Sequence, residues 1–392
     1  MSLKYPDIID PEGGANQSGL RDNNARVVLS FIRRHGALPS AEIARRSGLS
    51  AQTVSNITRA LLEEGLVLRD EAIKGKVGKP SVPVRLNPPG VHALGLSIGR
   101  RSVELVLVDF LGAQLASVSM SYAYPTIEEV MSFLQEGMNE IYFAHPKAKA
   151  RMAGIGLAVP GKLWDWLEVV NAPKAAMTKW RDIDIKAIVA QRTGLETYLE
   201  NDATSACVAE YLLGRGGEFV DFVYIFMGHF IGGGLVLNGR INSGRSGNAA
   251  ALGPMPVPDG AGGTTELLNV ASLHVLERKL RDVGLDPSRL RSSPTDWRFC
   301  EAQLTDWITT TADHLATAIA AITAVVDIEA ILIDGAMPGN VRRDLVEGTQ
   351  AAFRDIDLTL IERPEIEEAQ VGRNARSLGA ALLPIHARYF IA

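Results

Sequence analysis

Cysteine and long apolar runs are both scarce in this 392-residue chain. Its two cysteines, Cys207 and Cys300, stand far apart, which excludes a disulfide framework and a thiolate zinc cluster. The most apolar helical stretch, residues 315–326, stops at Asp327 and is too short to cross a bilayer. Residues 1–14 also lack the apolar core of a secretion signal. We therefore expect a globular protein of the reducing cytosol that does not enter a membrane.

The chain as a whole has no excess of basic residues, because its net charge is −5. Taken alone, that balance argues against nucleic acid as a partner. The charges are unevenly spread, however: residues 21–90 contain 12 Lys and Arg against 6 Asp and Glu, and residues 91–392 carry a net charge of −9. A basic head on an acidic body is expected of a DNA-binding module attached to a body that does not bind DNA.

Residues 40–65 have the pattern of two short helices that meet at a sharp turn. Gly48 allows the backbone reversal, and Ser50 is a natural N-cap for the second helix. Apolar residues three and four positions apart give that helix one core-facing side, formed by Val54, Ile57 and Leu61. This pattern is typical of a helix-turn-helix whose second helix enters the DNA major groove. A small helical bundle with a solvated polar face shows the same spacing, so the spacing by itself leaves both open.

The outer side of the second helix carries hydrogen-bonding groups and has no acid before Glu63. Residues 66–69 and 81–86 are predicted strands around a tip, residues 74–80, that is rich in glycine and lysine. Such a wing contacts phosphate or the minor groove. The predicted base-reading residues are Gln52, Thr53 and Asn56. The predicted phosphate-positioning residues are Ser50, Ser55, Arg59, Lys76 and Lys79.

Helices expected at residues 23–35, 41–47 and 51–64 complete a winged helix-turn-helix over residues 21–86. The wing and the local positive charge favour DNA binding over the helical bundle. Residues 1–20 contain two prolines and three glycines and are predicted to form a flexible arm.

After a linker at residues 87–90, the sequence takes on an α/β texture in two successive halves, residues 91–205 and 206–392. The expected strands are residues 93–98, 102–109, 114–121, 153–158, 222–227 and 330–333. Expected helices occupy 126–144, much of 264–283 and 302–326, and 376–389. The pattern predicts a partly parallel sheet in each half and a central cleft that closes around a small molecule. The last helix is expected to pack back on the first half.

Four stretches in this order resemble the ROK family (repressor, open reading frame, kinase). Residues 95–112 resemble its first phosphate-loop hairpin, and residues 154–161 its next core strand with a Pro-Gly turn. Residues 200–210 resemble its sugar-site segment, and residues 226–255 its second phosphate loop. The resemblance covers nearly the whole chain and implies a duplicated α/β fold of the actin-like, ribonuclease-H-like type. With its winged head, the chain is similar to the family's sugar-responsive transcriptional regulators.

The first loop departs from the pattern of the family's kinases, in which an acid followed by Gly-Gly-Thr helps to hold Mg²⁺ and admits phosphate. Ser97 replaces the acid, so a hard Mg²⁺ ion loses an oxygen ligand. Arg100 and Arg101 replace the second glycine and the threonine. Arg100 places a bulky side chain where the backbone should approach phosphate. The chain is therefore expected not to be an enzyme.

The family's structural zinc site is expected to be absent. Its histidine position is Pro254, and the segment that carries its three cysteines reads DGAGGTTELLN at residues 259–269, with no cysteine. Zinc needs about four nitrogen or sulfur ligands. We therefore expect no zinc at this site and no other cofactor.

The family's sugar site is half preserved. Its Asn-Asp pair, in which the aspartate is the catalytic base of the kinases, is retained as Asn201 and Asp202. One glutamate of the site is replaced by Ala251, and another falls at Leu268. We predict that Asn201 and Asp202 bind the ligand. A turn or helix cap, which also favours Asn and Asp, is the alternative for this pair.

These features predict a DNA-binding transcriptional regulator, expected to repress, whose body senses a sugar or a related small molecule. We expect a homodimer or homotetramer, since two recognition helices about 34–36 Å apart would read a palindromic operator. One alternative is a sugar kinase with an altered metal site that keeps Asp202 as its base, against which Ser97 and the two arginines argue. A second alternative is a ligand-independent DNA-binding scaffold, favoured by the residues lost from the sugar site.

Overall fold

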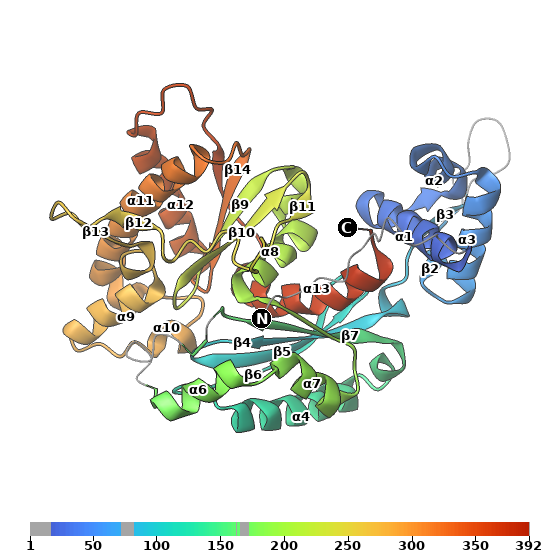
Figure 1. Cartoon of the computed structure of the whole chain (residues 1–392), viewed down its shortest axis with the longest axis horizontal. Coiled ribbons are helices and arrows are strands. Elements are labelled where there is room, and N and C mark those ends of the chain that lie inside the picture. Colours follow the sequence, from blue (N-terminus) through green and yellow to red (C-terminus); the bar gives the residue numbers. More distant parts are fainter. Residues whose placement is uncertain (1–16, 72–81, 162, 165–171, 392) are drawn as a thin grey trace. The chain divides into compact units, whose positions relative to one another are not determined.

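The computed structural model describes residues 17–71, 82–161, 163–164 and 172–391 (Figure 1). The chain divides into two compact units. The first unit consists of residues 1–157, 162–199 and 380–392, and the second of residues 158–161 and 200–379. One division therefore falls inside the last helix, and another lies at Glu200 rather than at the expected residue 206. Within the described ranges, no helix is both long and apolar enough to span a membrane.

Three helices and a small sheet form the N-terminal head. The helices are α1 (Gln17–His35), α2 (Ser40–Ser47) and α3 (Ala51–Glu63). The antiparallel sheet has the order β1-β3-β2, formed by Leu38–Pro39, Pro83–Leu86 and Val67–Arg69. This arrangement confirms the predicted winged helix-turn-helix. The wing tip with Lys76 and Lys79 lies outside the described residues.

Helix α1 begins earlier than the sequence suggested. It starts at Gln17, so residues 17–20 are helical although they were expected to belong to a flexible arm. Gly19 was interpreted as a helix breaker, but a glycine costs a helix only about 1 kcal/mol. The buried residues Val28, Leu29 and Ile32 anchor the later turns of α1, and that packing outweighs one unfavourable residue near its start.

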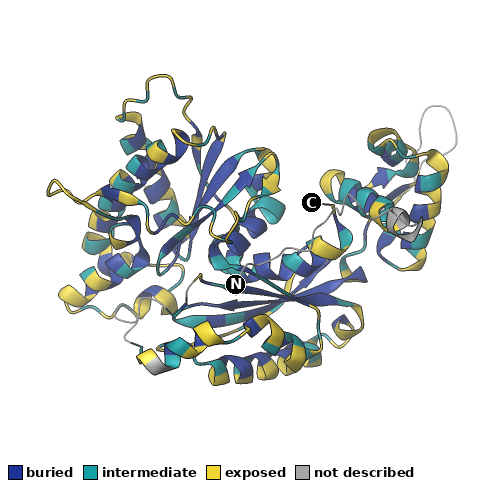
Figure 2. Ribbon diagram, viewed as in Figure 1, coloured by how far each residue is buried: buried dark blue, intermediate teal, exposed yellow. Residues whose placement is uncertain are grey.

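The first unit contains a five-stranded sheet of order β6-β5-β4-β7-β8. Its strands are β4 (His92–Ile98), β5 (Ser102–Asp109), β6 (Gln114–Ser121), β7 (Met152–Val159) and β8 (Thr197–Asn201). Helices α4 (Ile127–Ala144), α6 (Lys174–Asp182) and α7 (Ile185–Thr193) lie on one face, and residues 380–389 of α13 lie on the other (Figure 1). Strand β4 is accordingly buried at every position, which explains why most of its residues are apolar (Figure 2).

The second unit repeats this plan with a five-stranded sheet of order β11-β10-β9-β14-β15. Its strands are β9 (Phe222–Met227), β10 (Ile231–Leu237), β11 (Arg240–Ile241), β14 (Ala330–Gly335) and β15 (Glu365–Glu368). Strands β9 and β10 are antiparallel, whereas β14 runs parallel to both β9 and β15. Helix α8 (Asp202–Leu213) packs on β10, and α12 (Gly339–Arg354) packs on β15 and β14. The duplicated α/β architecture is thus confirmed.

One expected helix is shorter than predicted, and a hairpin strand occupies the first residues of its range. Residues 264–283 had a helical pattern, but Thr264–Glu266 form β13, which pairs with β12 (Pro256–Pro258), and α9 covers only Leu273–Asp282. The β-branched pair in β13 favours extended structure, and the glycine-rich turn before it closes the hairpin. The remaining helices are α10 (Arg289–Ser292), α11 (Glu301–Thr323) and α13 (Ala375–Tyr389).

Candidate nucleic-acid interface and effector site

Helix α3 separates an apolar side from a polar side, as its spacing predicted. Val54, Ile57 and Leu61 are buried, together with Thr58. Gly48 ends α2 in the left-handed conformation, with φ 72°. Because that conformation is costly for residues with a Cβ, this glycine permits the tight turn between the two helices. The polar side of α3 is left facing outward.

Three exposed side chains on α3 are held together by hydrogen bonds. Gln52 Nε2 donates to Asn56 Oδ1 at 3.1 Å, and Arg59 Nη2 donates to the same oxygen at 2.9 Å. The residues are spaced by four and three positions, so they share one helix face. Asn56 is therefore oriented by a neighbour on each side. The structure brings three of the predicted DNA-binding residues into one ordered row.

Ser50 is the N-cap of α3. Its hydroxyl oxygen accepts a hydrogen bond from the Thr53 amide at 3.1 Å and lies 2.8 Å from Thr53 Oγ1. Both side chains thus stand at the start of the helix, where free backbone amides favour an anion. Ser55 is also exposed. The roles of these residues toward DNA remain predictions.

Two arginines on α2 were missed by the sequence interpretation. Arg45 and Arg46 each form an ion pair with Glu42 at 2.6 Å, and their side chains are 71% and 38% exposed. Hydrogen bonds from Arg45 and then Arg46 lower the pKa of Glu42 to about 2. In helix-turn-helix proteins the first helix of the motif crosses the DNA backbone. A basic last turn on this helix was the signal that could have identified both residues.

Asn201 and Asp202 stand where β8 passes into α8. Asn201 Oδ1 accepts hydrogen bonds from the amides of Ala203 at 2.9 Å and Thr204 at 3.4 Å, so Asn201 is a helix cap. Its other amide atom, Nδ2, is directed elsewhere and would lie 3.4 Å from a Cβ placed on Gly161. The capping interpretation is therefore correct for Oδ1, and ligand binding by Asn201 stays a prediction.

The carboxylate of Asp202 pairs with Arg376, a residue that no sequence motif indicated. Arg376 Nη1 lies 3.5 Å from Asp202 Oδ2, and the two side chains are 23% and 19% exposed. The Arg376 guanidinium also stacks over Phe226, 5.4 Å from the ring centroid. Its buried Nε atom has no hydrogen-bond partner among the described residues. Since 174 positions separate Arg376 from Asp202, only the fold reveals this pair.

Glu200 and Asn248 complete the polar surroundings of the pair. Glu200 is 5% exposed, accepts the Asn201 amide at 2.8 Å with Oε1, and accepts the Ser243 hydroxyl at 3.1 Å with Oε2. Asn248 Oδ1 would lie 3.2 Å from a Cβ on Gly161, beside Asn201 Nδ2. A bare glycine backbone thus faces one amide donor and one amide acceptor. Such a set suits a polyhydroxylated ligand, whose hydroxyls both donate and accept.

The residues that depart from the kinase pattern lie in and after β4. Ser97 is buried within β4 and stands opposite Glu104 of β5. The turn that follows β4 is stabilised by a side chain from further along the sequence. The Tyr122 hydroxyl donates toward the carbonyls of Gly99 at 2.7 Å and Ser102 at 2.9 Å. Arg101 donates to the carbonyl of Ala123. The side chains at this turn therefore support the turn itself.

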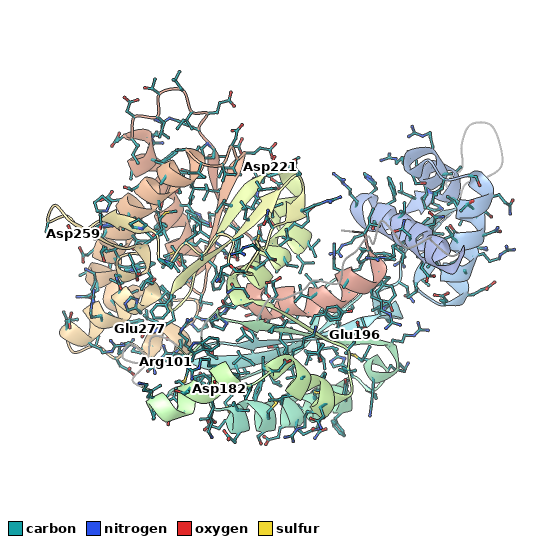
Figure 3. The ribbon with its side chains drawn as sticks, viewed as in Figure 1. Arg101, Asp182, Glu196, Asp221, Asp259 and Glu277 are labelled. Atoms are coloured by element: carbon teal, nitrogen blue, oxygen red, sulfur yellow. The ribbon has the colours of Figure 1, made fainter. Side chains whose placement is uncertain are left out.

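His229, in the loop between β9 and β10, belongs to a polar cluster around the buried carboxylate Glu277. Its Nδ1 atom lies 3.6 Å from Glu277, a carboxylate on α9 that also pairs with Arg291 at 2.8 Å and Arg281 at 3.2 Å (Figure 3). Burial lowers the pKa of the neighbouring His274 to about 4. We interpret this cluster as a packed support for the loop.

Known protein families match both the winged head and the α/β body of the chain. The MarR family model matches residues 18–72, and the ROK family model matches residues 93–387. Among relatives, y4fQ of Sinorhizobium fredii is 27% identical over 94% of this chain and 92% of its own. A putative xylose repressor of Caldicellulosiruptor is 28% identical over 62% of this chain and 60% of its own.

Two solved structures show the same fold. A ROK family transcriptional regulator, described as a homologue of the E. coli MLC protein, aligns over 94% of this chain and 97% of its own, with 22% identity and a TM-score of 0.70. A ROK hexokinase from Thermus thermophilus covers 74% of this chain and 97% of its own, with 25% identity and a TM-score of 0.53. The kinase therefore aligns with a smaller part of the chain than the regulator does. By its sequence over residues 93–387, the chain belongs to the ROK family.

Proposed function

We propose that this protein is a transcriptional repressor whose winged head binds an operator and whose ROK body senses a small carbohydrate. The observation that carries the proposal is the ordered polar row of Gln52, Asn56 and Arg59 on the exposed side of α3. An exposed row of this kind on a recognition helix is suited to base edges in the major groove and to the phosphates beside them. The regulators among its relatives support the same conclusion.

The DNA contacts divide into two groups. Gln52, Thr53 and Asn56 read bases, while Ser50, Ser55 and Arg59 position phosphate at the start and along the side of α3. Lys76 and Lys79 of the wing, together with Arg45 and Arg46 of α2, add backbone contacts. A homodimer or homotetramer presents two such heads to a palindromic operator, with half-sites about 34–36 Å apart or a multiple of that distance.

The effector site is formed around Asn201 and Asp202. We propose a sugar as the effector, and D-xylose is the first compound to test because several relatives are named xylose repressors. Asp202 accepts hydrogen bonds from sugar hydroxyls, and Asn201 Nδ2 and Asn248 Oδ1 act as donor and acceptor. Binding would shift the equilibrium between two states of the protein that differ in DNA affinity.

The protein is proposed to be a sensor without catalytic activity. Ser97 offers no carboxylate for Mg²⁺, and Asp202, the position of the kinase base, is paired with Arg376. The retained Asp202 is the feature that favours a kinase as the second candidate. ATP turnover over a panel of hexoses, pentoses and N-acetylhexosamines, abolished by Asp202→Asn, would establish the kinase instead.

Fluorescence anisotropy with DNA from the region upstream of the protein's own gene tests the repressor. We expect sequence-preferring binding at about 0.15 M salt, where screening has weakened long-range charge contacts, and release or strengthening on addition of the sugar. Equal affinity for the upstream region and for random DNA of the same length would overturn the proposal.

A further inference from the structure

Helix α13 has one end in each compact unit. It runs from Ala375 to Tyr389, and the division between the units falls after Gly379. Arg376 in its first turn reaches Asp202, whereas Phe390 and Ile391 just beyond its last turn contact the DNA-binding head. One helix (red in Figure 1) therefore carries a residue of the candidate effector site and the anchor of the head.

At the effector end, α13 is packed directly against α8. A Cβ atom on Gly379 would lie 1.6 Å from the carbonyl oxygen of Ser205, so the two backbones touch with no side chain between them. Helix α8 begins with Asp202, the partner of Arg376. Because close-packed contacts transmit displacement rather than absorb it, movement of the first turn of α8 reaches α13 directly.

In its middle, α13 rests on the first unit in the same manner. A Cβ on Gly156 of β7 would lie 1.8 Å from the carbonyl oxygen of Ala380. Pro384 has no N–H with which to close the helical hydrogen bond to that carbonyl. The helix is thus held against β7 at Ala380 and lacks one backbone hydrogen bond at the same place. A movement of its first turn can be passed to its last turn about this point. We call α13 in this role the lever.

At the head end, three residues of α1 hold the end of the chain. Arg26 Nε donates to the Phe390 carbonyl at 2.8 Å, Ser30 Oγ accepts the Ile391 amide at 3.0 Å, and the Arg33 guanidinium lies 4.7 Å from the Phe390 ring centroid. Spacings of four and three place all three on one face of α1. The Phe390 ring is 2% exposed and stacks on Phe110 at 5.6 Å, so it is fixed to the body as well as to the head.

We propose that Arg376 is the positioning residue through which occupancy of Asp202 reaches the head, with α13 as the connecting lever. The proposal rests on the proposed function, since it assigns the regulation of that same site. At 3.5 Å the Arg376–Asp202 contact is at the long limit of a hydrogen bond, so a sugar hydroxyl donating to Asp202 displaces it readily. The first turn of α13 then moves, and the hold of Phe390 and Ile391 on α1 changes.

Hydrogen–deuterium exchange of the full chain tests the lever without requiring DNA or a sugar. Arg376→Ala should speed exchange in α1 and at residues 389–391 by about 5-fold or more, the lower range of coupling between distant sites. The matched control is Arg343→Ala, which removes an exposed arginine of α12 that pairs with Glu368 at 3.4 Å. It should leave α1 unchanged. Arg376→Lys, which keeps the charge, should restore slow exchange in part and serves if the alanine variant folds poorly.

A second set of variants removes the contacts that Arg26 and Arg33 of α1 make with Phe390. When Arg26 and Arg33 are both replaced by glutamine, the further change Arg376→Ala should have no additional effect on exchange in α1. The control background is Arg34→Gln, because Arg34 is exposed on the same helix. In that background the effect of Arg376→Ala on α1 should persist. If α1 exchanges at the same rate in the wild type, in Arg376→Ala and in Arg343→Ala, the proposal that α13 acts as a lever is overturned. A response of α1 to Arg376→Ala in a protein that binds neither operator DNA nor D-xylose would keep the lever and reject the proposed function.

Discussion

Asparagine illustrates how a single residue type takes different roles in this molecule. Asn56 is exposed on α3, and its Oδ1 is held by Gln52 and Arg59, so its amide group is oriented before any DNA arrives. Asn201 uses the same atom, Oδ1, to cap α8 and turns Nδ2 toward Gly161. In both residues Oδ1 accepts hydrogen bonds from the protein itself.

Two substitutions on α3 should have different effects on DNA binding. Gln52→Ala should relax the preference at one base pair, at a cost of about 1–3 kcal/mol for the preferred sequence. Arg59→Ala should weaken binding to all sequences alike and reduce the slope of log affinity against log salt by about 1. Anisotropy titrations against operator variants at several salt concentrations measure both effects.

Arg34→Ala, a change to an exposed arginine on α1, is the control for the loss of positive charge. It should change neither the sequence preference nor the salt slope by as much as Arg59→Ala. If the Gln52 and Arg59 variants instead behave alike, the groove assignment is wrong even where DNA binding itself is found.

Asp202→Asn should weaken sugar binding while the protein stays folded. The substitution keeps the shape of the side chain but removes the charge that pairs with Arg376 and accepts sugar hydroxyls. We expect a loss of affinity of about 10-fold or more, which corresponds to about 1.4 kcal/mol. Calorimetric titration with D-xylose and a panel of hexoses measures it. Asp313→Asn, at an exposed position of α11, should leave the affinity unchanged.

At the scale of elements, the contact between α8 and α13 depends on one residue without a side chain. Gly379→Ala would place a Cβ 1.6 Å from the Ser205 carbonyl oxygen, so the helices must separate. We expect the free energy of unfolding to fall by about 1–3 kcal/mol or more, seen as a lower melting temperature.

Gly339→Ala is the matched control for this prediction. Gly339 begins α12, and a Cβ there would meet no atom within 4 Å. Alanine should leave the melting temperature unchanged or raise it slightly, because it restricts the unfolded chain. Equal effects of the two substitutions would show that α8 and α13 are not tightly packed.

The β12–β13 hairpin occupies the segment where the family's zinc cysteines are expected. Its turn is closed by Asp259, which accepts the amides of Ala261 and Gly263 at 2.8 Å each (Figure 3). These two hydrogen bonds, that of Ala261 first, lower the pKa of Asp259. A carboxylate therefore organises this hairpin turn.

We propose that the protein binds no zinc, and elemental analysis tests this. After purification without added metal, the zinc content should be far below one ion per chain, and dialysis against EDTA should leave the melting temperature unchanged. A stoichiometric content of zinc, together with loss of stability on its removal, would contradict the proposal.

At the scale of the whole molecule, two half-buried histidines should make stability sensitive to acid. Burial lowers the pKa of His274 to about 4, and burial, with the Arg33 and Arg26 cations, lowers that of His386 to about 4. Below about pH 6.5 the unfolded chain takes up protons that the folded chain does not. The free energy of unfolding should therefore fall as the pH drops from about 6.5 to about 4.

The loss over that range should be up to about 3 kcal/mol for His386 and smaller for His274, which solvent screens more. Denaturant titrations at a series of pH values measure it. His386→Gln should make the dependence shallower, whereas His35→Gln, at an exposed position, should not. A free energy of unfolding that is constant from pH 7 to pH 4 in the wild type would exclude neutral rings at these two positions.

Local patterns in the sequence determined much of this protein. The spacing of Val54, Ile57 and Leu61 determined which side of α3 is buried, because helical periodicity depends only on neighbours three and four positions apart. Strand-like patterns rich in apolar residues likewise predicted the strands at Ser102–Asp109 and Phe222–Met227 with their observed bounds. The excess of positive charge in residues 21–90 distinguished the head from the acidic body.

Features that depend on packing between distant segments of the chain were decided only by the tertiary structure. Thr264–Glu266 became a strand because β12 was available as a partner, although the segment has a helical pattern. Arg376 became the partner of Asp202, and Phe390 the anchor of α1, across 174 and 364 positions of sequence. No periodicity records such pairs, since they arise when separate elements pack together. The sequence therefore identified the two ends of the regulator, and the fold identified the helix that joins them.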